Sequence, residues 1–293
     1  MPLKFIKSPI KDKNSLRKTL HGHLAGLEPG RPLKTLHASD LTYDEYEFCP
    51  RERALQLRDK VKPPPQRITT SEQVTYRIGW DLESAVRDWF VELGMLVGDW
   101  ACMHCGRKYL FQKKPHKCKL CSHKHFEYHE VRVQTKSGIG CGLDMLLDMP
   151  GSAKHVILEH KSIDKEKYKS LVAPLAAHVR RAKLYLKGVA EDESNRSNLI
   201  RSDKMLILYT SKGGYGTSCP EVKLWDFWDG AFSPFKDFEI ERDDAAIDDI
   251  ESKALELDDW KKTGNLPCRI CKSSMDKRAK KCNRQTVCWS EDE

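Results

Sequence analysis

Three residues, Asp144, Glu159 and Lys161, carry side chains that together could hold a divalent cation and assist a hydrolytic reaction. They lie in or beside two apolar runs, residues 143–149 and 155–158, which flank the sequence Pro150-Gly151-Ser152. A short turn-forming sequence between two apolar runs is typical of a β-hairpin. The sequence therefore predicts two antiparallel strands that carry these residues.

The register of this hairpin decides whether the three side chains meet. If residues 150–153 form the loop, counting back along both strands places Asp144 opposite Glu159, with Cβ atoms about 5 Å apart. Because side chains alternate along a strand, Glu159 and Lys161 share a face while His160 points the other way. We therefore expect two carboxylates and an ammonium group to converge.

Carboxylates at that distance repel each other unless a cation lies between them, and hard oxygen ligands suit Mg²⁺ or Mn²⁺. A divalent ion held there can polarise a phosphodiester and activate a water molecule. The ammonium group of Lys161 would orient that water or offset the charge that develops on the phosphate. The alternative is a surface hairpin that carries scattered charges and binds no ion.

An Asp on one strand and Glu-x-Lys on the next, here Asp144, Glu159 and Lys161, resemble the signature of the PD-(D/E)XK nuclease superfamily. The resemblance implies an α/β core in which helices flank a mixed central sheet. It also implies that Asp144 and Glu159 bind Mg²⁺ or Mn²⁺, that the main-chain carbonyl of His160 completes the ligand set, and that Lys161 positions the attacking water.

A helix predicted over residues 74–96 contains a further match. The sequence from Gly79 to Arg87 resembles the Gly-x-x-x-(His/Glu) helix of the same superfamily, which contributes a metal ligand. The resemblance implies that Glu83 is this ligand and joins the catalytic group. The alternative is a solvated glutamate on an amphipathic helix.

Eleven cysteines in a chain without a signal-peptide pattern indicate metal sites rather than disulfides. Four of them form two Cys-x2-Cys pairs, and two such pairs can place four thiolates around Zn²⁺. The sequence thus predicts a zinc-ribbon insertion over residues 100–127, with the ligands Cys102, Cys105, Cys118 and Cys121.

Basic and aromatic residues are interleaved within this insertion. Lys113 and Lys114 belong to the basic set, and Tyr109, Phe111 and Phe126 are the aromatic residues. Such a surface could contact the backbone and bases of DNA. The alternative is a zinc site that only stabilises a small insertion without its own core.

Cys49 follows a short helix predicted to begin at Ser39 or Asp40 and to end near Phe48. This arrangement resembles the RecB-like nucleases that carry an iron-sulfur cluster, in which one such cysteine joins three from the far end of the chain. The resemblance implies a [4Fe-4S] cluster. Its expected ligands are Cys49, Cys271, Cys282 and Cys288, with Cys268 as an alternative. A second zinc site built from the four C-terminal cysteines alone remains open.

The order of the remaining predicted elements gives a further point of resemblance to the superfamily. Strands are predicted over 128–135, 205–210 and 222–228, and helices over 170–187 and 243–257. The order of helix, three strands, helix and strand resembles that of the superfamily core. In the RecB-like branch the second helix carries Gln-x-x-x-Tyr, so the resemblance implies that Tyr185 contacts DNA. Arg181 replaces the Gln, and it could bind a phosphate or lie on a solvated face.

The whole chain has the composition of a globular protein with a polyanionic partner. It has 293 residues, 39% of them hydrophobic and 32% charged, and a formal charge of +8. We expect a basic N-terminal arm over residues 1–36 and a nuclease domain over 37–293, whose cysteine cluster module spans 265–290. No apolar run is long enough to cross a bilayer and no signal peptide is evident, so we expect a cytoplasmic protein without a membrane partner.

These patterns together predict a metal-dependent DNA exonuclease that acts on a single strand or a duplex end. Viral or mobile-element recombination, replication or DNA degradation is the expected setting, with a recombination or replication protein as a further partner. Two alternatives remain. One is a zinc and iron-sulfur protein that binds nucleic acid without cutting it, and the other is a structure-specific endonuclease of the same fold. No feature of the sequence indicates an oligomeric state.

Overall fold

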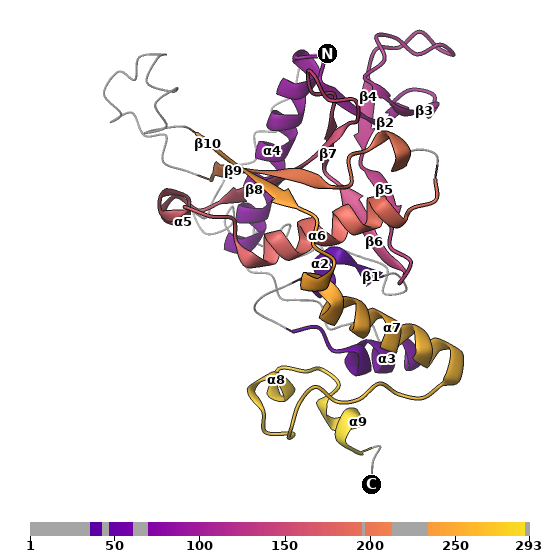
Figure 1. Ribbon diagram of the computed structural model, residues 1–293, viewed down its shortest axis with the longest axis vertical. Coiled ribbons are helices and arrows are strands. Elements are labelled where there is room, and N and C mark those ends of the chain that lie inside the picture. The colour runs from indigo at the N-terminus through magenta and orange to yellow at the C-terminus, as the bar shows by residue number, and fades with distance from the viewer. Residues whose placement is uncertain (1–35, 43–46, 61–69, 195–196, 213–233, 291–293) are drawn as a thin grey trace, which may run out of the picture.

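The computed structural model describes residues 36–42, 47–60, 70–194, 197–212 and 234–290. The molecule has an upper body built on β-sheets and a helical lobe below it (Figure 1). The predicted N-terminal arm, apart from Leu36, and the predicted strand over 222–228 lie outside the described residues.

A seven-stranded mixed sheet forms the centre of the body. Only β8 and β9 run parallel, and the other neighbours are antiparallel. The order is β10 (Phe235–Glu241), β9 (Lys204–Ser211), β8 (Val156–Ile163), β7 (Met145–Leu147), β2 (Leu96–Cys102) and β3 (Lys108–Lys113), with β4 (Phe126–His129) paired to β2. The predicted mixed α/β architecture is confirmed. Strand β2 ties the cysteine-rich insertion directly to the central sheet, a connection that the sequence had not indicated.

A second, three-stranded sheet consists of β1 (Leu36–His37), β6 (Ile139–Leu143) and β5 (Val131–Gln134). Two stretches predicted as single strands are each divided between the two sheets. The break between β4 and β5 falls at Glu130, and the break between β6 and β7 falls at Asp144. Both breaks therefore place a carboxylate where the sheets separate.

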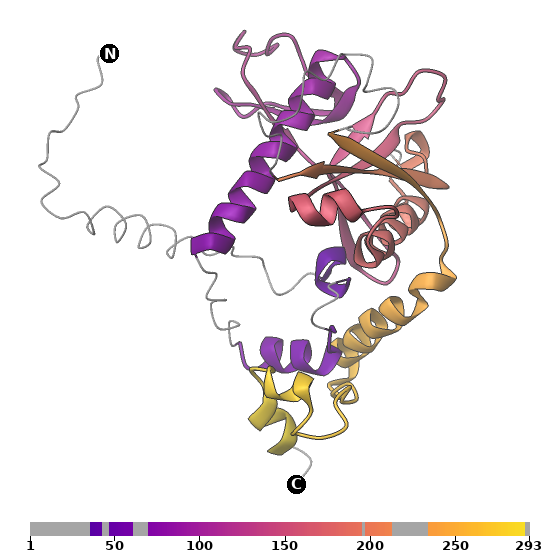
Figure 2. The same cartoon turned by 90° about the vertical axis from the view of Figure 1, so that its left-hand side faces the viewer.

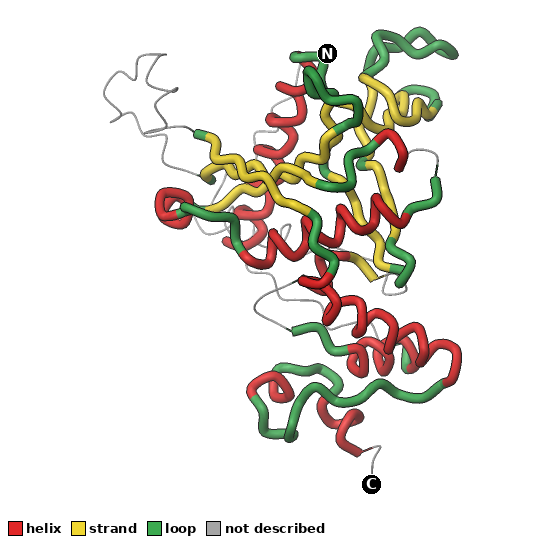
Figure 3. The backbone as a smooth tube through the Cα atoms, in the orientation of Figure 1, coloured by secondary structure: helices red, strands yellow, loops and turns green. Residues whose placement is uncertain are grey.

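Helices cover both faces of the large sheet (Figure 3). Helix α4 (Thr70–Glu92) packs Val86 against Leu158 on one face, and α6 (Ala176–Glu191) packs Leu184 and Leu186 into the core on the other. The helix predicted over 170–187 is wrong at its start, because the short α5 (Lys165–Ser170) ends there. Pro174 then disfavours helical geometry in the residue before it, so α6 begins only at Ala176.

The lower lobe joins segments from both ends of the chain. Helix α3 (Pro50–Arg58) lies beside α7 (Asp248–Thr263) and above α8 (Lys277–Lys280) and α9 (Gln285–Ser290), as Figure 2 shows. The helix predicted to end near Phe48 is wrong, because α2 (Ala38–Leu41) is a single turn. The longer helix starts at Pro50, whose fixed φ suits a first helical position, and Cys49 caps it.

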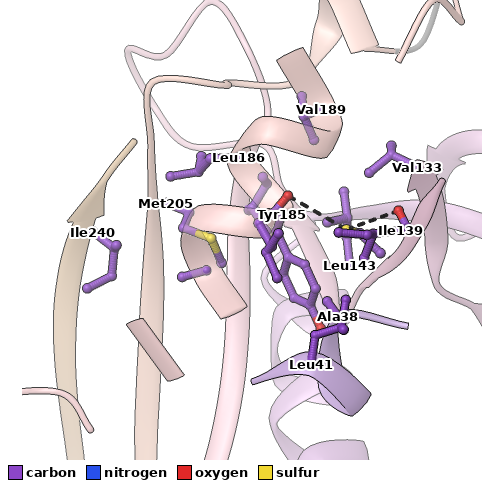
Figure 4. Packing of buried hydrophobic residues seen from close by; sticks show 14 of the residues in the cluster. Ala38, Leu41, Val133, Ile139, Leu143, Tyr185, Leu186, Val189, Met205 and Ile240 are labelled. Carbon is purple, nitrogen blue, oxygen red and sulfur yellow. Dashed lines mark hydrogen bonds between the residues drawn. The ribbon is translucent and has the colours of Figure 1, made fainter. Parts of the chain in front are cut away.

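The hydrophobic core lies between α6 and the two sheets (Figure 4). Leu186, Ile157 and Ile207 are fully buried, and each such side chain stabilises the fold by about 1.5–3 kcal/mol. Tyr185 lies within this cluster with 6% of its surface exposed. No helix in the described ranges combines the length and apolar character needed to cross a membrane.

Candidate active site

The hairpin formed by β7 and β8 has the register predicted from the sequence. Leu147 pairs with Val156 and Met145 with Leu158, so Asp144 and Glu159 are the next pair in the same ladder. Asp144 lies in the bend between β6 and β7, and its Oδ2 accepts a hydrogen bond from the His160 amide at 3.1 Å. This bond holds the Asp144 carboxylate against β8.

The Lys161 ammonium group lies among three oxygen-bearing groups. It forms an ion pair with Glu159, lies 3.7 Å from Asp144 Oδ2, and donates a hydrogen bond to the main-chain carbonyl of His160 at 3.1 Å. The sequence had predicted these three groups as metal ligands. The structure therefore brings them together around one positive charge.

Glu159 is the most deeply buried of these acids, with 1% of its surface exposed. Apart from its ion pair with Lys161, its carboxylate accepts no hydrogen bond from the described residues. Burial and then the Asp144 carboxylate raise the pKa of Glu159 to about 8. Burial would lower the pKa of Lys161, but Glu159 and Asp144 outweigh it and raise that pKa. The site thus concentrates negative charge in a place that water barely reaches.

Glu83 approaches the same acids from the α4 side of the sheet. Its carboxylate forms an ion pair with Arg87, one turn further along the helix. Burial and then the Asp144 carboxylate raise the pKa of Glu83 to about 7. Glu83 is therefore an electrostatic neighbour of Asp144, and its role as a metal ligand stays a prediction.

Glu130 is a further acid at this place, and none of the motifs found in the sequence includes it. Val131 pairs with Leu143, so Glu130 and Asp144 are the next pair of the β5–β6 ladder. Burial and the Asp144 carboxylate raise the pKa of Glu130. A Cβ at Gly142 would lie 2.5 Å from Glu130 Oε2, so a side chain at position 142 would make this carboxylate move. Counting back from the turn at Ser137-Gly138 would have found it.

The donor set fits a hard divalent cation. Four carboxylates come from four separate segments, and burial and the Asp144 carboxylate raise the pKa of the other three; at Glu159 the carboxylate oxygens have no hydrogen-bond donor besides Lys161 among the described groups. Such oxygen-rich, negatively charged surroundings suit Mg²⁺ or Mn²⁺ rather than a soft metal.

We predict that pH controls both stability and cation affinity here. The folded protein keeps protons on Glu83 and Glu159 above their ordinary pKa of 4.5, so stability without metal falls as pH rises from about 4.5 to about 8. A cation needs the ionised carboxylates, so its affinity rises over the same range. The Mn²⁺-induced gain in Tm, measured from pH 6 to 8.5, should be greatest at the highest pH. An equal gain at every pH would show that other groups bind the ion.

The other residues around the hairpin take different roles. The His160 ring points away from the acids, and one ring nitrogen lies 3.0 Å from Thr210 Oγ1. Burial lowers the pKa of His160 to about 4, so the ring is neutral. Arg181 Nη1 lies 3.9 Å from Glu159 Oε1, which places this cation at the site. Tyr185 is buried in the core with 6% of its surface exposed, and its contact with DNA stays a prediction.

The four cysteines of the insertion converge as predicted. Their Sγ atoms all lie within 4.8 Å of one another, with Cys102–Cys121 and Cys105–Cys118 at 3.5 Å. Tetrahedral zinc thiolates have sulfurs about 3.8 Å apart, so the spacing fits Zn²⁺. Hydrogen bonds from Tyr109 and from backbone amides outweigh burial and lower the pKa of Cys118 to about 5.

The surface of this insertion differs from the prediction. Tyr109 and Phe126 are buried and pack edge to face, so they do not alternate with lysines on the outside. Lys113 forms an ion pair with Asp148 at 2.7 Å, and Lys114 lies over the Trp100 ring at 5.7 Å. The aromatic residues therefore stabilise the module, while these two lysines stay near its surface.

A pocket in the lower lobe gathers the cysteines predicted for the cluster. Cys49, Cys271, Cys282 and Cys288 all line it, together with Arg278 and Trp289. Cys268 is exposed and does not line the pocket. The arrangement therefore brings Cys49 to the C-terminal cysteines and leaves Cys268 outside.

No family model matches the sequence, and no curated protein matches it either. Among solved structures, the chain is similar to the alkaline exonuclease LHK-Exo from Laribacter hongkongensis, with a TM-score of 0.40 and 13% identity over 84% of this chain and 97% of that chain. LHK-Exo in complex with dAMP gives a TM-score of 0.41 and 14% identity, over 85% of this chain and 100% of that chain.

Proposed function

We propose that the protein is a Mg²⁺- or Mn²⁺-dependent DNA nuclease of the PD-(D/E)XK superfamily. The observation that carries this proposal is the convergence of Asp144, Glu159 and the His160 carbonyl around the Lys161 ammonium. A buried carboxylate pair of this kind has little use in a purely structural hairpin, because burying like charges together destabilises the fold.

The chemistry divides among these residues. Asp144, Glu159, the His160 carbonyl and Glu83 would hold the ion, with Glu130 beside them. The bound ion supplies Lewis acidity and a water molecule of lowered pKa. Lys161, freed from its ion pair, donates hydrogen bonds to the attacking water or to a phosphate oxygen. Arg181 is close enough to Glu159 to offset charge on the phosphate.

We propose exonuclease rather than endonuclease activity, on a single strand or a duplex end, in the recombination, replication or degradation of viral or mobile-element DNA. Lys113 and Lys114 would contact the backbone from the insertion. In the same proposal Cys102, Cys105, Cys118 and Cys121 hold Zn²⁺, and Cys49, Cys271, Cys282 and Cys288 hold a [4Fe-4S] cluster. A recombination or replication protein is the expected further partner.

The test compares end-labelled linear DNA with covalently closed circular DNA in the presence of Mn²⁺. We expect the linear molecule to be degraded and the circle to persist, and we expect Lys161→Ala to degrade neither. Nicking of the circle by the wild type would identify an endonuclease. Binding of both substrates without any hydrolysis would favour a non-catalytic nucleic-acid-binding protein, and equal degradation by wild type and variant would reveal a contaminant.

A further inference from the structure

Helix α4 carries two exposed aromatic residues in line with the candidate metal ligand. Tyr76, Trp80, Glu83 and Arg87 follow one another at intervals of four, three and four residues. Residues at these intervals lie on one side of an α-helix. The aromatic pair therefore continues the line of Glu83 and Arg87 toward the N-terminal end of α4.

The packing of α4 shows which side this is. A Cβ at Gly79 would lie 3.0 Å from Ser162 Oγ, and Val86 is buried with 2% exposure, so these two residues face the sheet. The Arg87 guanidinium lies over the Tyr128 ring of β4, 4.7 Å from its centre. The flank with Tyr76 and Trp80 is therefore the one turned toward β4 and the bend at Asp144.

The opposite flank of α4 supplies an internal comparison. Trp89 comes nine residues after Trp80, which places it about 180° around the helix. Its ring makes an edge-to-face contact with Phe235 of β10, at 5.9 Å between centroids. One helix thus presents two exposed tryptophans, one on the side of the acids and one on the side of β10.

The aromatic pair on the acid side is open to solvent. Trp80 is 61% exposed and Tyr76 is 47% exposed, whereas Glu83 one turn along is largely covered. Figure 2 shows the N-terminal end of α4 projecting beyond the body. Neighbouring exposed apolar side chains that are bordered by polar residues can mark an interaction site.

We propose that Trp80 and Tyr76 form a stacking platform for unpaired nucleobases of a DNA strand. The proposal rests on the proposed function, since the strand is the one whose phosphate reaches Asp144 and Glu159. Trp80 lies about 4.5 Å along the helix axis from Glu83, and Tyr76 about 6 Å further. These steps suit successive bases of a strand pulled out of its duplex, so the platform selects single-stranded DNA or a frayed end.

Charge near the platform supports a nucleic-acid occupant. Lys212 donates a hydrogen bond from Nζ to the Thr75 carbonyl at 3.2 Å and would lie 3.5 Å from a Cβ at Gly79, so this ammonium group lies on the sheet-facing side of α4, next to the aromatic flank rather than on it. Arg87 lies at the other end of the same flank. A phosphate backbone that follows the two rings would therefore run toward the Arg87 guanidinium, with the Lys212 ammonium on the neighbouring side of the helix.

The experiment measures the affinity of the full-length holoprotein for a fluorescent single-stranded oligonucleotide, with Ca²⁺ replacing Mn²⁺ to prevent cleavage. We expect Trp80→Ala to weaken binding about 5- to 150-fold, the range that stacking of one base contributes. Trp80→Phe should retain binding within about threefold, because a ring remains. Trp89→Ala is the matched control, and it should bind as the wild type does. The salt dependence should be unchanged in every variant, because no phosphate contact is lost.

Wild-type affinity in Trp80→Ala would overturn the platform, and so would equal losses in Trp80→Ala and Trp89→Ala. Failure of the proposed function gives a different result, namely a wild type that does not cleave DNA with Mn²⁺ although it binds the oligonucleotide. If the wild type cleaves DNA while Trp80→Ala binds the oligonucleotide normally, the proposed nuclease function stands and only the stacking platform is refuted. Circular dichroism melting of each variant excludes unfolding as the cause of weaker binding.

Discussion

Glu159→Gln is expected to lower DNA hydrolysis about 10³-fold, equivalent to about 4 kcal/mol of transition-state stabilisation. The amide has nearly the same shape as the carboxylate but carries no charge for the cation. The same change should leave the metal-free protein at least as stable as the wild type. Glu159 is 1% exposed and close to Asp144, so replacing its carboxylate relieves an unfavourable burial of charge. Steady-state cleavage of a labelled duplex and thermal unfolding measure the two effects.

Glu166→Gln is the matched control for this prediction. Glu166 lies on α5 with 78% of its side chain exposed, and it pairs with Lys169 rather than with the hairpin acids. We expect wild-type cleavage and stability from this variant. Substantial activity in Glu159→Gln, or a loss of activity that is fully explained by a lower Tm, would contradict the assignment of Glu159 as a metal ligand.

If Cys282 is a ligand of the proposed [4Fe-4S] cluster, Cys282→Ser is expected to lose the iron and to unfold the C-terminal module. Ala279 is the only buried hydrophobic residue among the described residues 265–290, so little apolar packing holds the module in place. Arg51 donates to the Pro267 carbonyl at 3.1 Å, and each such bond contributes only about 1 kcal/mol. A metal centre would therefore dominate its stability.

Iron analysis and limited proteolysis of anaerobically purified protein measure this effect. The wild type should contain about four iron atoms per chain and resist cleavage beyond Gly264. Cys282→Ser should have lost its iron and be cleaved there. Cys268→Ser is the control, because Cys268 is exposed and lies outside the pocket, and it should behave as the wild type. One zinc ion in place of iron would establish the alternative zinc site, as would loss of metal from Cys268→Ser.

Local patterns predicted the hairpin of β7 and β8 because its register depends on neighbours in sequence. The turn at Pro150-Gly151-Ser152 and the alternation of apolar residues were enough to pair Asp144 with Glu159. The same reasoning failed where a strand changes partners. A single strand was predicted over 128–135, so the break at Glu130 was missed, although the turn at Ser137-Gly138 sets a register that places Glu130 opposite Asp144.

Long-range packing explains the other differences. Tyr185 was assigned to DNA by resemblance, but the core between α6 and the small sheet encloses it, as Figure 4 shows. The aromatic residues of the insertion were expected on its surface, yet Tyr109 turns inward to donate a hydrogen bond to Cys118. In both places the hydrophobic body of the ring is buried, and a residue pattern alone does not reveal which residues will pack against that ring.

Anomalous diffraction from a crystal soaked in Mn²⁺, recorded near the manganese absorption edge, tests the cation site most directly. We expect a peak bounded by Asp144 Oδ2, the Glu159 carboxylate and the His160 carbonyl, with the Lys161 ammonium displaced toward the open side. The same soak of Glu159→Gln should give no peak there. A wild-type crystal without manganese density between these groups, while the insertion cysteines show their own metal, would contradict the proposed catalytic centre.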